Sequence, residues 1–485
     1  LSWAAATAAS VMSFAIAVAL TAEVLTGGSI SYDMGGWPGP YGIVIHIGAL
    51  GSMVLLLVTG ASAIALVSGR ESLGSQVPGD RRHLFYAAWL IVLAGLAGIT
   101  VTGDAFNVFV FMEISSLASY ILIAAGPDRR ALTATFKYLI MGTVGATFYL
   151  IGVGLVYMMT GTLNFADIEM RIAEVADQRP ILVAAGFITV GLALKAAVFP
   201  LHIWLPNAYT FAPHIVTAFF AACSTKVAIY VLLRFDFLVF QANLSEHVNQ
   251  FATFLLPLSL LGILVGSAVA MLEGSLKRLL AWSSVAQIGY ILLGAGFSSH
   301  AGLTASVTHM FNHALAKGAM FLALAGMAMH MNQLLLKDIG GIGRRMPWTT
   351  AALVIAGASL VGIPGTAGFV SKWLLLQAAF EQGPLGMVAI AVVVLSSLAA
   401  VYYVWRIVET LYFKPAVVEA APTEAPLQLL LVTWAVALAN IVFGFFPQVA
   451  LANQVGLPTD DEQRARLSET GGTLFDLRED DGLFT

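Results

Sequence analysis

The sequence predicts an all-α polytopic membrane protein with about 13 to 14 transmembrane helices. Of its 485 residues, 59% are hydrophobic and only 10% are charged, and the mean hydropathy is +0.87. In a soluble domain about a quarter of the residues are charged. Apolar runs of about 20 residues, the length that crosses a hydrocarbon core of roughly 30 Å, recur between polar breaks along almost the whole chain.

We place 13 spans on these runs. Their approximate bounds are 3 to 25, 41 to 68, 84 to 102, 104 to 125, 131 to 160, 181 to 204, 211 to 234, 250 to 272, 276 to 297, 301 to 330, 347 to 377, 386 to 413 and 427 to 447. Eleven basic residues follow even-numbered spans, whereas only Arg171, Arg179 and Arg234 follow odd-numbered ones. The positive-inside rule therefore predicts that Leu1 is cytoplasmic and that Thr485 is outside.

Two of the spans are broken by a proline, and each of them carries a lysine. Pro200 follows Lys195 by five residues, and Lys372 follows Pro364 by eight. A proline inside a helix removes a backbone hydrogen bond, and in lipid the freed carbonyl must face protein, water or an ion. The second break also contains Gly362, Gly365 and Gly368. Two such breaks in corresponding halves indicate a transport path, although a kinked packing helix is an alternative for the second.

Several ionisable side chains lie deep inside apolar spans. One at mid-bilayer costs about 2.5–3.5 kcal/mol, so its presence is a functional hypothesis by default. Glu113 is far from both ends of its span, and Lys195 and Lys226 are also central. Structural pairing is the alternative for Glu113, and snorkelling is the alternative for the lysines. Lys137, close to Arg130, reaches the interface more easily and is only an accessory candidate.

The most informative local pattern is THMFNHALAKGAMF, in which His309, His313 and Lys317 lie at i, i+4 and i+8. This spacing places all three on one helix face. A polar stripe in lipid must face protein or water, and histidine titrates near neutral pH. We therefore expect a proton-carrying face, with a hydrogen-bonded strut as the alternative. His202 and His214, near the first break, are further accessory candidates.

No cofactor or metal site is expected. Met310 stands where the HEXXH zinc motif requires glutamate. The only cysteine, Cys223, lies inside a span, which leaves no cysteine-ligated cluster. No phosphate loop or basic nucleic-acid patch is present, so nucleic acid is not an expected partner. The buried acid, lysines and histidines are spread over different spans, a pattern that indicates a relay for a small cation.

Six segments in order resemble the antiporter-like membrane subunits shared by Mrp-type multisubunit Na+/H+ antiporters, respiratory NADH:quinone oxidoreductase and membrane-bound hydrogenases. They are TGDAFNVFVFMEISSLASYIL, LKAAVFPLHIWLPNAY, STKVAIYVLLR, KRLLAWSSVAQIGY, HMFNHALAKGAMF and GIPGTAGFVSKW. GGWPGPYGIVIHI and TGDAFNVFVFME are most similar to the D-type subunits of the Mrp antiporters.

The resemblance implies fourteen helices with two inverted five-helix repeats, each containing one broken helix. On this basis we divide the chain into N-terminal helices (1–102), a first repeat (103–240), a second repeat (241–413) and a C-terminal helix with an acidic tail (414–485). The count of 13 spans indicates that the family's first helix is absent. The family's acidic residue after GGWP is also missing, because HIGALGSM offers only His46.

The resemblance assigns roles to residues at matching positions. Glu113 and Lys195 match the family's glutamate–lysine pair, and Lys226 matches its central lysine. The polar helix corresponds to His309, His313 and Lys317, and the lysine of the second broken helix corresponds to Lys372.

We therefore expect a proton-conducting subunit of a Na+/H+ antiporter, with Na+ or K+ as the exchanged ion. It would reside in a bacterial inner membrane with partner membrane subunits and surrounding lipid, and it would not itself be an enzyme. The alternatives are a proton-pumping subunit of a redox complex, a scaffold that transports nothing, and an uptake system for another small ion such as inorganic carbon.

Overall fold

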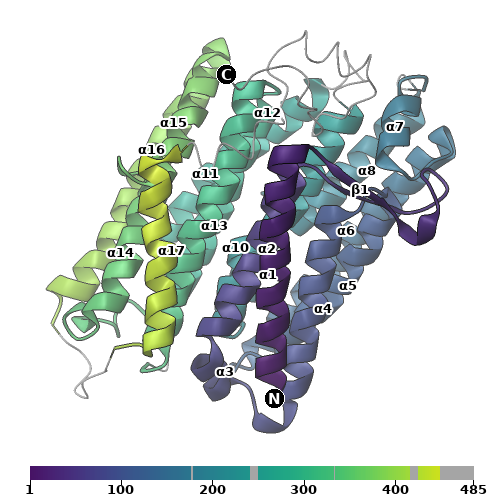
Figure 1. Cartoon of the computed structure of the whole chain (residues 1–485). Coiled ribbons are helices and arrows are strands. Elements are labelled where there is room, and N and C mark those ends of the chain that lie inside the picture. Colours follow the sequence, from purple (N-terminus) through teal and green to yellow (C-terminus); the bar gives the residue numbers. More distant parts are fainter. Residues whose placement is uncertain (176–177, 241–248, 332–333, 416–423, 448–485) are drawn as a thin grey trace.

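Apolar sequence runs fold into a bundle of long helices in the computed structural model, which describes residues 1–175, 178–240, 249–331, 334–415 and 424–447 (Figure 1). The helices in order are α1 (Ser2–Gly27), α2 (Ala49–Ser68), α3 (Arg70–Gln76), α4 (Arg82–Val101), α5 (Ala105–Ala124), α6 (Arg130–Thr160), α7 (Phe165–Ile172), α8 (Arg179–Ala196), α9 (Trp204–Phe211), α10 (His214–Arg234), α11 (Asn249–Leu272), α12 (Leu276–Gly296), α13 (His300–Ala328), α14 (Pro347–Val361), α15 (Ala367–Phe380), α16 (Gly383–Val408) and α17 (Leu427–Phe445).

Within these ranges, 11 helices are long and apolar enough to cross a membrane. The shorter helices α14 and α15 are also apolar and follow one another along the chain. The predicted fold class, an all-α polytopic membrane protein with broken helices, is confirmed. The domain limits at residues 103, 241 and 414 remain predictions.

The span predicted at 41 to 68 begins too early. Its first residues form β2 (Val44–Ile47), which pairs antiparallel with β1 (Ile30–Asp33), and α2 starts only at Ala49. The β-branched residues Val44, Ile45 and Ile47 favour a strand here. The hairpin is supported by the link between α4 and α5, because the Gly103 N–H donates to the Val44 carbonyl at 2.8 Å. Predicting it required knowledge of this distant contact.

The two predicted breaks are present. α8 ends at Ala196, where Ala197 adopts a left-handed φ of 58°, and α9 begins after Pro200. α14 ends at Val361, where Gly362 adopts a φ of 90°, and α15 follows. Each break lies in the fourth segment of five, in the series α4, α5, α6, α8 with α9, α10 and in the series α11, α12, α13, α14 with α15, α16.

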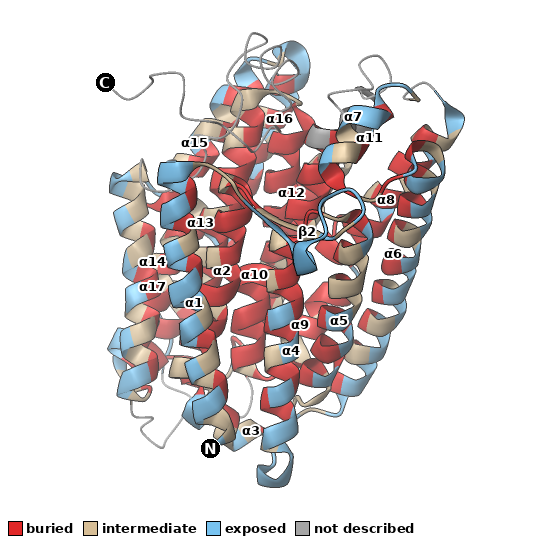
Figure 2. Ribbon diagram, turned by 45° about the vertical axis from the view of Figure 1, so that its right-hand side comes forward, coloured by how far each residue is buried: buried red, intermediate tan, exposed pale blue. Residues whose placement is uncertain are grey.

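The centre of the bundle is built from α10, α12 and α13, which are buried along almost their whole length (Figure 2). α10 packs directly against α13, and α13 packs against α12 and α15. Polar side chains on these three helices therefore face protein rather than lipid. The contact between α10 and α13 joins the first broken-helix region to the second.

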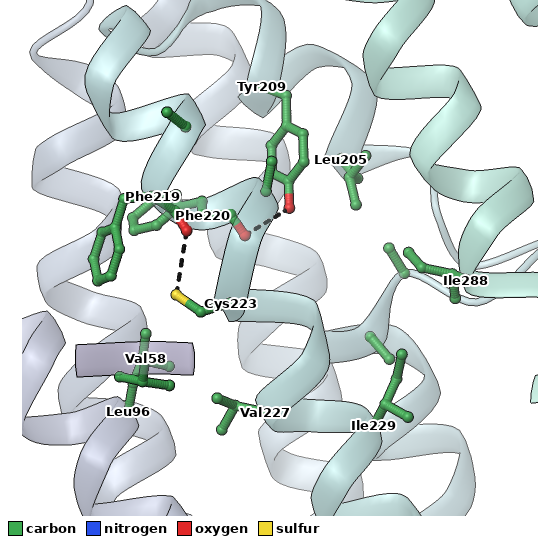
Figure 3. Packing of buried hydrophobic residues seen from close by; sticks show 14 of the residues in the cluster. Val58, Leu96, Leu205, Tyr209, Phe219, Phe220, Cys223, Val227, Ile229 and Ile288 are labelled. Carbon is green, nitrogen blue, oxygen red and sulfur yellow. Dashed lines mark hydrogen bonds between the residues drawn. The ribbon is translucent and has the colours of Figure 1, made fainter. Parts of the chain in front are cut away.

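The core around α10 is apolar and closely packed (Figure 3). Cys223 lies in this core, and its thiol donates to the Phe219 carbonyl at 3.2 Å. The Tyr209 hydroxyl donates to the Phe220 carbonyl at 3.1 Å. The cysteine is thus a satisfied packing residue.

The two ends of the bundle differ. The N-terminus and α3 lie at one end, and the β1–β2 hairpin and α7 lie at the other (Figure 1). We call the second the hairpin end; that it faces outward, as the positive-inside rule predicts, remains a prediction. α10 starts at the N-terminal end and reaches the hairpin end at Arg234, which donates to the Thr102 carbonyl at 2.6 Å.

Candidate functional site: a buried row of ionisable side chains

The first break brings Lys195 and Glu113 together. Lys195 lies in the last turn of α8, and its Nζ is 3.4 Å from the Oε1 of Glu113 on α5. The same Nζ donates to the Ser116 hydroxyl at 2.7 Å. The Lys195 side chain is 5% exposed and that of Glu113 is 26% exposed, so the pair is buried on the lysine side and more open on the acid side.

Aromatic residues hold the broken end of α8 in place. The Trp204 indole N–H donates to the Leu194 carbonyl at 2.9 Å, which satisfies one of the carbonyls that a helix end leaves free. The Trp204 ring stacks on Tyr138, with centroids 4.1 Å apart. Lys195 is therefore positioned by a break whose backbone is satisfied by a side chain.

A small cavity of about 30 Å³ extends from Lys195 along α10. Ser116, Tyr138, Ser224 and Val227 are among its lining residues. A single water needs about 10–15 Å³ of such space, so the cavity has room for about two. Hydroxyl groups line it on both sides, which makes it suitable for water that carries a proton between α8 and α10.

Lys226 and Lys317 are fully buried and donate to backbone carbonyls. Lys226 on α10 donates to the Ala221 carbonyl. Lys317 on α13 donates to the Leu280 carbonyl at 2.8 Å and to the Ser283 hydroxyl. A positive charge on Lys226 would repel one on Lys317.

His309 and His313 lie on one face of α13, as the spacing predicts. Their rings are nearly parallel, at 4°, with centroids 6.4 Å apart. His309 is hydrogen-bonded through both ring nitrogens, to Ser371 Oγ and Gln287 Oε1, each at 2.9 Å. In the described part of the chain neither ring nitrogen of the buried His313 has a hydrogen-bond partner.

Lys372 lies at the second break. Its Nζ donates to the Leu360 and Val361 carbonyls, at 3.1 and 2.9 Å, which are the last carbonyls of α14. It also donates to Ser397 at 3.1 Å and lies 5.0 Å from the ring centroid of Tyr290, within the range of a cation–π contact. The ammonium group thus occupies the negative end of the α14 dipole.

Together these side chains form a row through the bundle centre. It runs from Glu113 and Lys195 to Lys226, whose neighbour Val227 lines the small cavity, on to the histidine face with Lys317, and to Lys372 on α15. Below we call these seven residues the relay. Glu113 is the only carboxylate among them. Chemically, such a row can accept, store and pass protons.

The accessory candidates lie outside the relay. Lys137 is exposed on α6. His202 is buried between Phe199 and Trp282, with ring centroids at 5.3 and 5.0 Å. The backbone N–H of His214, at the start of α10, donates to Gln76 Oε1 at 3.0 Å.

Pro200 and Pro364, with Gly362 and Gly365, lie in the two breaks. In the described ranges no group of three or more His, Cys, Asp or Glu is arranged to hold a metal.

Sequence reasoning missed the neutral partners of the relay. Ser283, Gln287 and Tyr290 lie on α12 at spacings of four and three residues, in SSVAQIGY, and all three contact a relay residue. That helical spacing was the available signal. Lys277, one of the eleven basic residues assigned to loops after even-numbered spans, is in fact buried and donates to the Ala212 carbonyl at 2.6 Å.

The chain is similar to known membrane proteins. A family described as NADH:quinone oxidoreductase/Mrp antiporter, TM, matches residues 102–399. NADH-quinone oxidoreductase subunit N of Desulforudis audaxviator is 39% identical over 457 residues, 91% of this chain and 90% of that one. The D-type subunit of the Na(+)/H(+) antiporter of Bacillus subtilis is 31% identical over 401 residues, 83% of this chain and 80% of that one.

Solved structures of related membrane subunits have a similar fold. A chain of the membrane-bound sulfane sulfur reductase, an archaeal respiratory membrane complex, superposes with a TM-score of 0.85 at 29% identity, covering 93% of this chain and 90% of that one. A chain of the Mrp complex from Dietzia sp. DQ12-45-1b gives 0.83 at 25% identity, covering 93% and 91%. Both belong to multisubunit membrane complexes.

Proposed function

The chain belongs to the NADH:quinone oxidoreductase/Mrp antiporter membrane family, and from this premise we propose that it conducts protons in a multisubunit antiporter that exchanges Na+ or another monovalent cation for H+. It is an antiporter-like membrane subunit. The proton-conducting role rests on one observation, the relay between the two broken helices at the bundle centre, and the exchange of a cation is suggested by the 31% identity to an antiporter subunit.

In the proposed mechanism Glu113 and Lys195 act as a gate. While Lys195 faces Glu113 at 3.4 Å, the carboxylate stabilises its positive charge. When the two separate, Lys195 loses its counter-charge in a low-dielectric interior, and its proton moves on towards Lys226. The hydroxyl-lined cavity beside Lys195 provides room for the water that this transfer needs.

His313 is the proposed carrier at the centre. Because its ring nitrogens are not engaged by protein groups among the described residues, it can take a proton on one nitrogen and release one from the other. His309, fixed by Gln287 and Ser371, passes the proton towards Lys372. Lys372 then serves the second half-channel, at the break between α14 and α15.

We propose that partner membrane subunits complete the antiporter and that the protein resides in a bacterial inner membrane. Large apolar side chains are exposed on several helices, for example Leu398, Val401 and Trp405 on α16. In a membrane such a face contacts lipid or another subunit. H+ and Na+ or K+ are the proposed transported ions.

A redox-driven proton pump is the second candidate. It is favoured by the 39% identity to a NADH-quinone oxidoreductase subunit, which exceeds the 31% to an antiporter subunit. The same relay serves both functions, so the relay residues do not separate them. A scaffold role fits the site less well, because a scaffold has no use for a buried histidine without hydrogen-bond partners.

Proton movement in inverted vesicles that contain the whole complex distinguishes these functions. The antiporter proposal predicts that adding Na+ to energised vesicles dissipates the pH gradient, and that vesicles lacking the complex do not respond. Acidification of the vesicle interior by a redox substrate, with no response to Na+ or K+, would replace this proposal with the redox pump. The absence of both responses would favour the scaffold.

A further inference from the structure

A second and larger cavity, of about 360 Å³, lies at the hairpin end of the bundle and takes no part in the relay. It is bounded by the β1–β2 hairpin, the link between α4 and α5, α7, and the last turns of α10. A water molecule needs about 10–15 Å³ of such space, so the cavity has room for a cluster of waters. We call it the vestibule.

The vestibule has a polar lining. Asp167 on α7 accepts from the Arg171 guanidinium at 2.8 Å through Oδ1, and in the described part of the chain its Oδ2 has no hydrogen-bond partner. Glu169 lies two residues further on and also lines the cavity. Across from them, the Ser31 hydroxyl lies 2.9 Å from Nδ1 of His46. Carboxylates at the mouth of a water-filled cavity attract cations from solution.

Arg234 stiffens the wall between the vestibule and the bundle. Its Nη1 donates to the Thr102 carbonyl at 2.6 Å, and its guanidinium lies 4.0 Å from the ring centroid of Phe165. The side chain is 5% exposed. The end of α10 is thereby attached to both α7 and the α4–α5 link.

The vestibule and the cavity beside Lys195 border different faces of α10. Tyr230 and Arg234 line the vestibule, whereas Val227 and Val231 line the inner cavity. Because a helix has 3.6 residues per turn and rises 1.5 Å per residue, Tyr230 and Val231 lie at nearly the same height on neighbouring faces of α10. On α4, Ile99 lines the inner cavity, and the next residue, Thr100, is the one that Tyr230 contacts.

Tyr230 is the vestibule residue next in sequence to Val231 of the inner cavity. Its hydroxyl donates to the Thr100 carbonyl on α4 at 3.2 Å. The same hydroxyl lies beside Gly51 on α2, where an added Cβ would be 3.1 Å from the tyrosine oxygen. The phenol is 4% exposed and is therefore held in the gap between α2 and α4.

From this geometry we propose that the vestibule is an aqueous access path for hydrated protons from the hairpin end to Lys195 and Glu113, with Tyr230 as the plug that closes it. The proposal rests on the proton-conducting function proposed above. Rotation of the Tyr230 side chain away from Thr100 joins the two cavities. Asp167 and Glu169 collect protons at the mouth.

Cysteine labelling of this subunit tests the path, because Cys223 is the only cysteine in its sequence. In a Cys223→Ala background of the whole complex, single cysteines are placed at Ala166, which lines the vestibule, and at Val231, which lines the inner cavity. A cationic, membrane-impermeant methanethiosulfonate is added to either face. Leu232→Cys is the matched control, since Leu232 is buried on α10 but lines neither cavity.

The expected result is that Ala166→Cys reacts from the outer face and that Val231→Cys is protected until Tyr230→Ala is added. The cationic reagent should react with Ala166→Cys faster than an anionic one of similar size, and Asp167→Asn with Glu169→Gln should reduce the difference. Continued protection of Val231→Cys in the Tyr230→Ala variant, or labelling from the inner face alone, would overturn the proposal.

Loosening of α10 would appear as labelling of Leu232→Cys in the Tyr230→Ala variant. In that case Tyr230→Phe, which keeps the ring and loses only the hydroxyl, tests the plug. Faster labelling of Val231→Cys without labelling of Leu232→Cys supports the plug, and unchanged labelling of Val231→Cys refutes it. Labelling does not depend on ion exchange. If the complex exchanges Na+ for H+ but Val231→Cys stays protected in every variant, only the access path is contradicted. If Val231→Cys is labelled as expected but the complex shows no antiport, only the proposed function is contradicted.

Discussion

The Nδ1 of His309 lies 2.9 Å from the Oγ of Ser371. This contact joins α13, which carries the histidine face, to α15. Lys372 directly follows Ser371 on α15. The other ring nitrogen of His309 is engaged by Gln287, so this histidine is fixed on both sides. Four residues further on, His313 has no such partner among the described residues. The two histidines therefore differ in what a substitution should do.

His313→Leu should abolish proton flux and leave the thermal stability of the purified complex unchanged or slightly higher. Removing a buried polar group that has no hydrogen bond costs little, whereas leaving a former partner unsatisfied costs about 1–3 kcal/mol. His309→Leu should therefore lower stability as well as flux, because Gln287 loses its partner. Melting curves measured beside vesicle flux separate the two. Equal destabilisation by both substitutions would show that His313 is also a structural strut.

Ser116→Ala should slow proton flux by about two- to tenfold, the effect of losing a hydrogen bond worth about 0.5–1.5 kcal/mol. Ser116 accepts from Lys195 at 2.7 Å, while Glu113 remains in place to hold the charge. In a double-mutant cycle with Glu113→Gln, measured as the thermal stability of the purified complex, the two effects should not add, because both residues contact the same ammonium group. Full additivity would mean that Ser116 acts independently of the pair.

Gly362→Ala should reduce both stability and flux. Gly362 has a φ of 90°, and an added Cβ would lie 3.0 Å from the Cδ of Lys372. The left-handed backbone alone costs about 1–2 kcal/mol for a residue with a side chain.

Gly383→Ala is the matched control, because Gly383 has a φ of 61° with open space around it. The Gly383→Ala variant should lose about as much stability as Gly362→Ala and should keep the wild-type proton flux. A loss of flux in the control as great as in Gly362→Ala would show that flux follows general stability rather than the position of Lys372.

Asp104→Asn should change how stability depends on pH. Asp104 lies in the α4–α5 link, and burial raises the pKa of its carboxyl, opposed by hydrogen bonds from Asn107 and Phe106. Because the folded-state pKa lies above the unfolded value of about 3.9, the native protein loses stability as pH rises through the raised pKa. Asparagine keeps the helix cap of α5, so the variant should lack this loss. Identical pH profiles for the two proteins would contradict the burial effect.

The residues that could be predicted from sequence are those whose charge is conspicuous in an apolar run. Glu113, Lys195 and Lys372 were predicted in this way, and the α13 stripe was predicted from its spacing; their role in proton transfer remains a proposal. Gln287 and Ser371 were missed, because amides and hydroxyls are common in transmembrane helices and become informative only when their partners are known.

The breaks were predicted from Pro200 and Pro364, but the helices end earlier, at Ala196 and Val361. Proline disfavours helix in the residue before it, and the left-handed residues Ala197 and Gly362 terminate the helices upstream of each proline. The β1–β2 hairpin was missed for another reason. It has a backbone contact with Gly103, more than 50 residues away, and local sequence carries no sign of that contact.

The central claim is that protons cross this subunit through the relay, and Na+-driven proton flux in inverted vesicles tests it most directly. Glu113→Gln and Lys372→Ala are compared with Glu71→Gln and Lys414→Ala, which make the same chemical changes at exposed positions, all at matched expression. We predict that the first two abolish the flux and that the two controls retain it. Wild-type flux in Glu113→Gln and Lys372→Ala would contradict the account and make these buried charges structural.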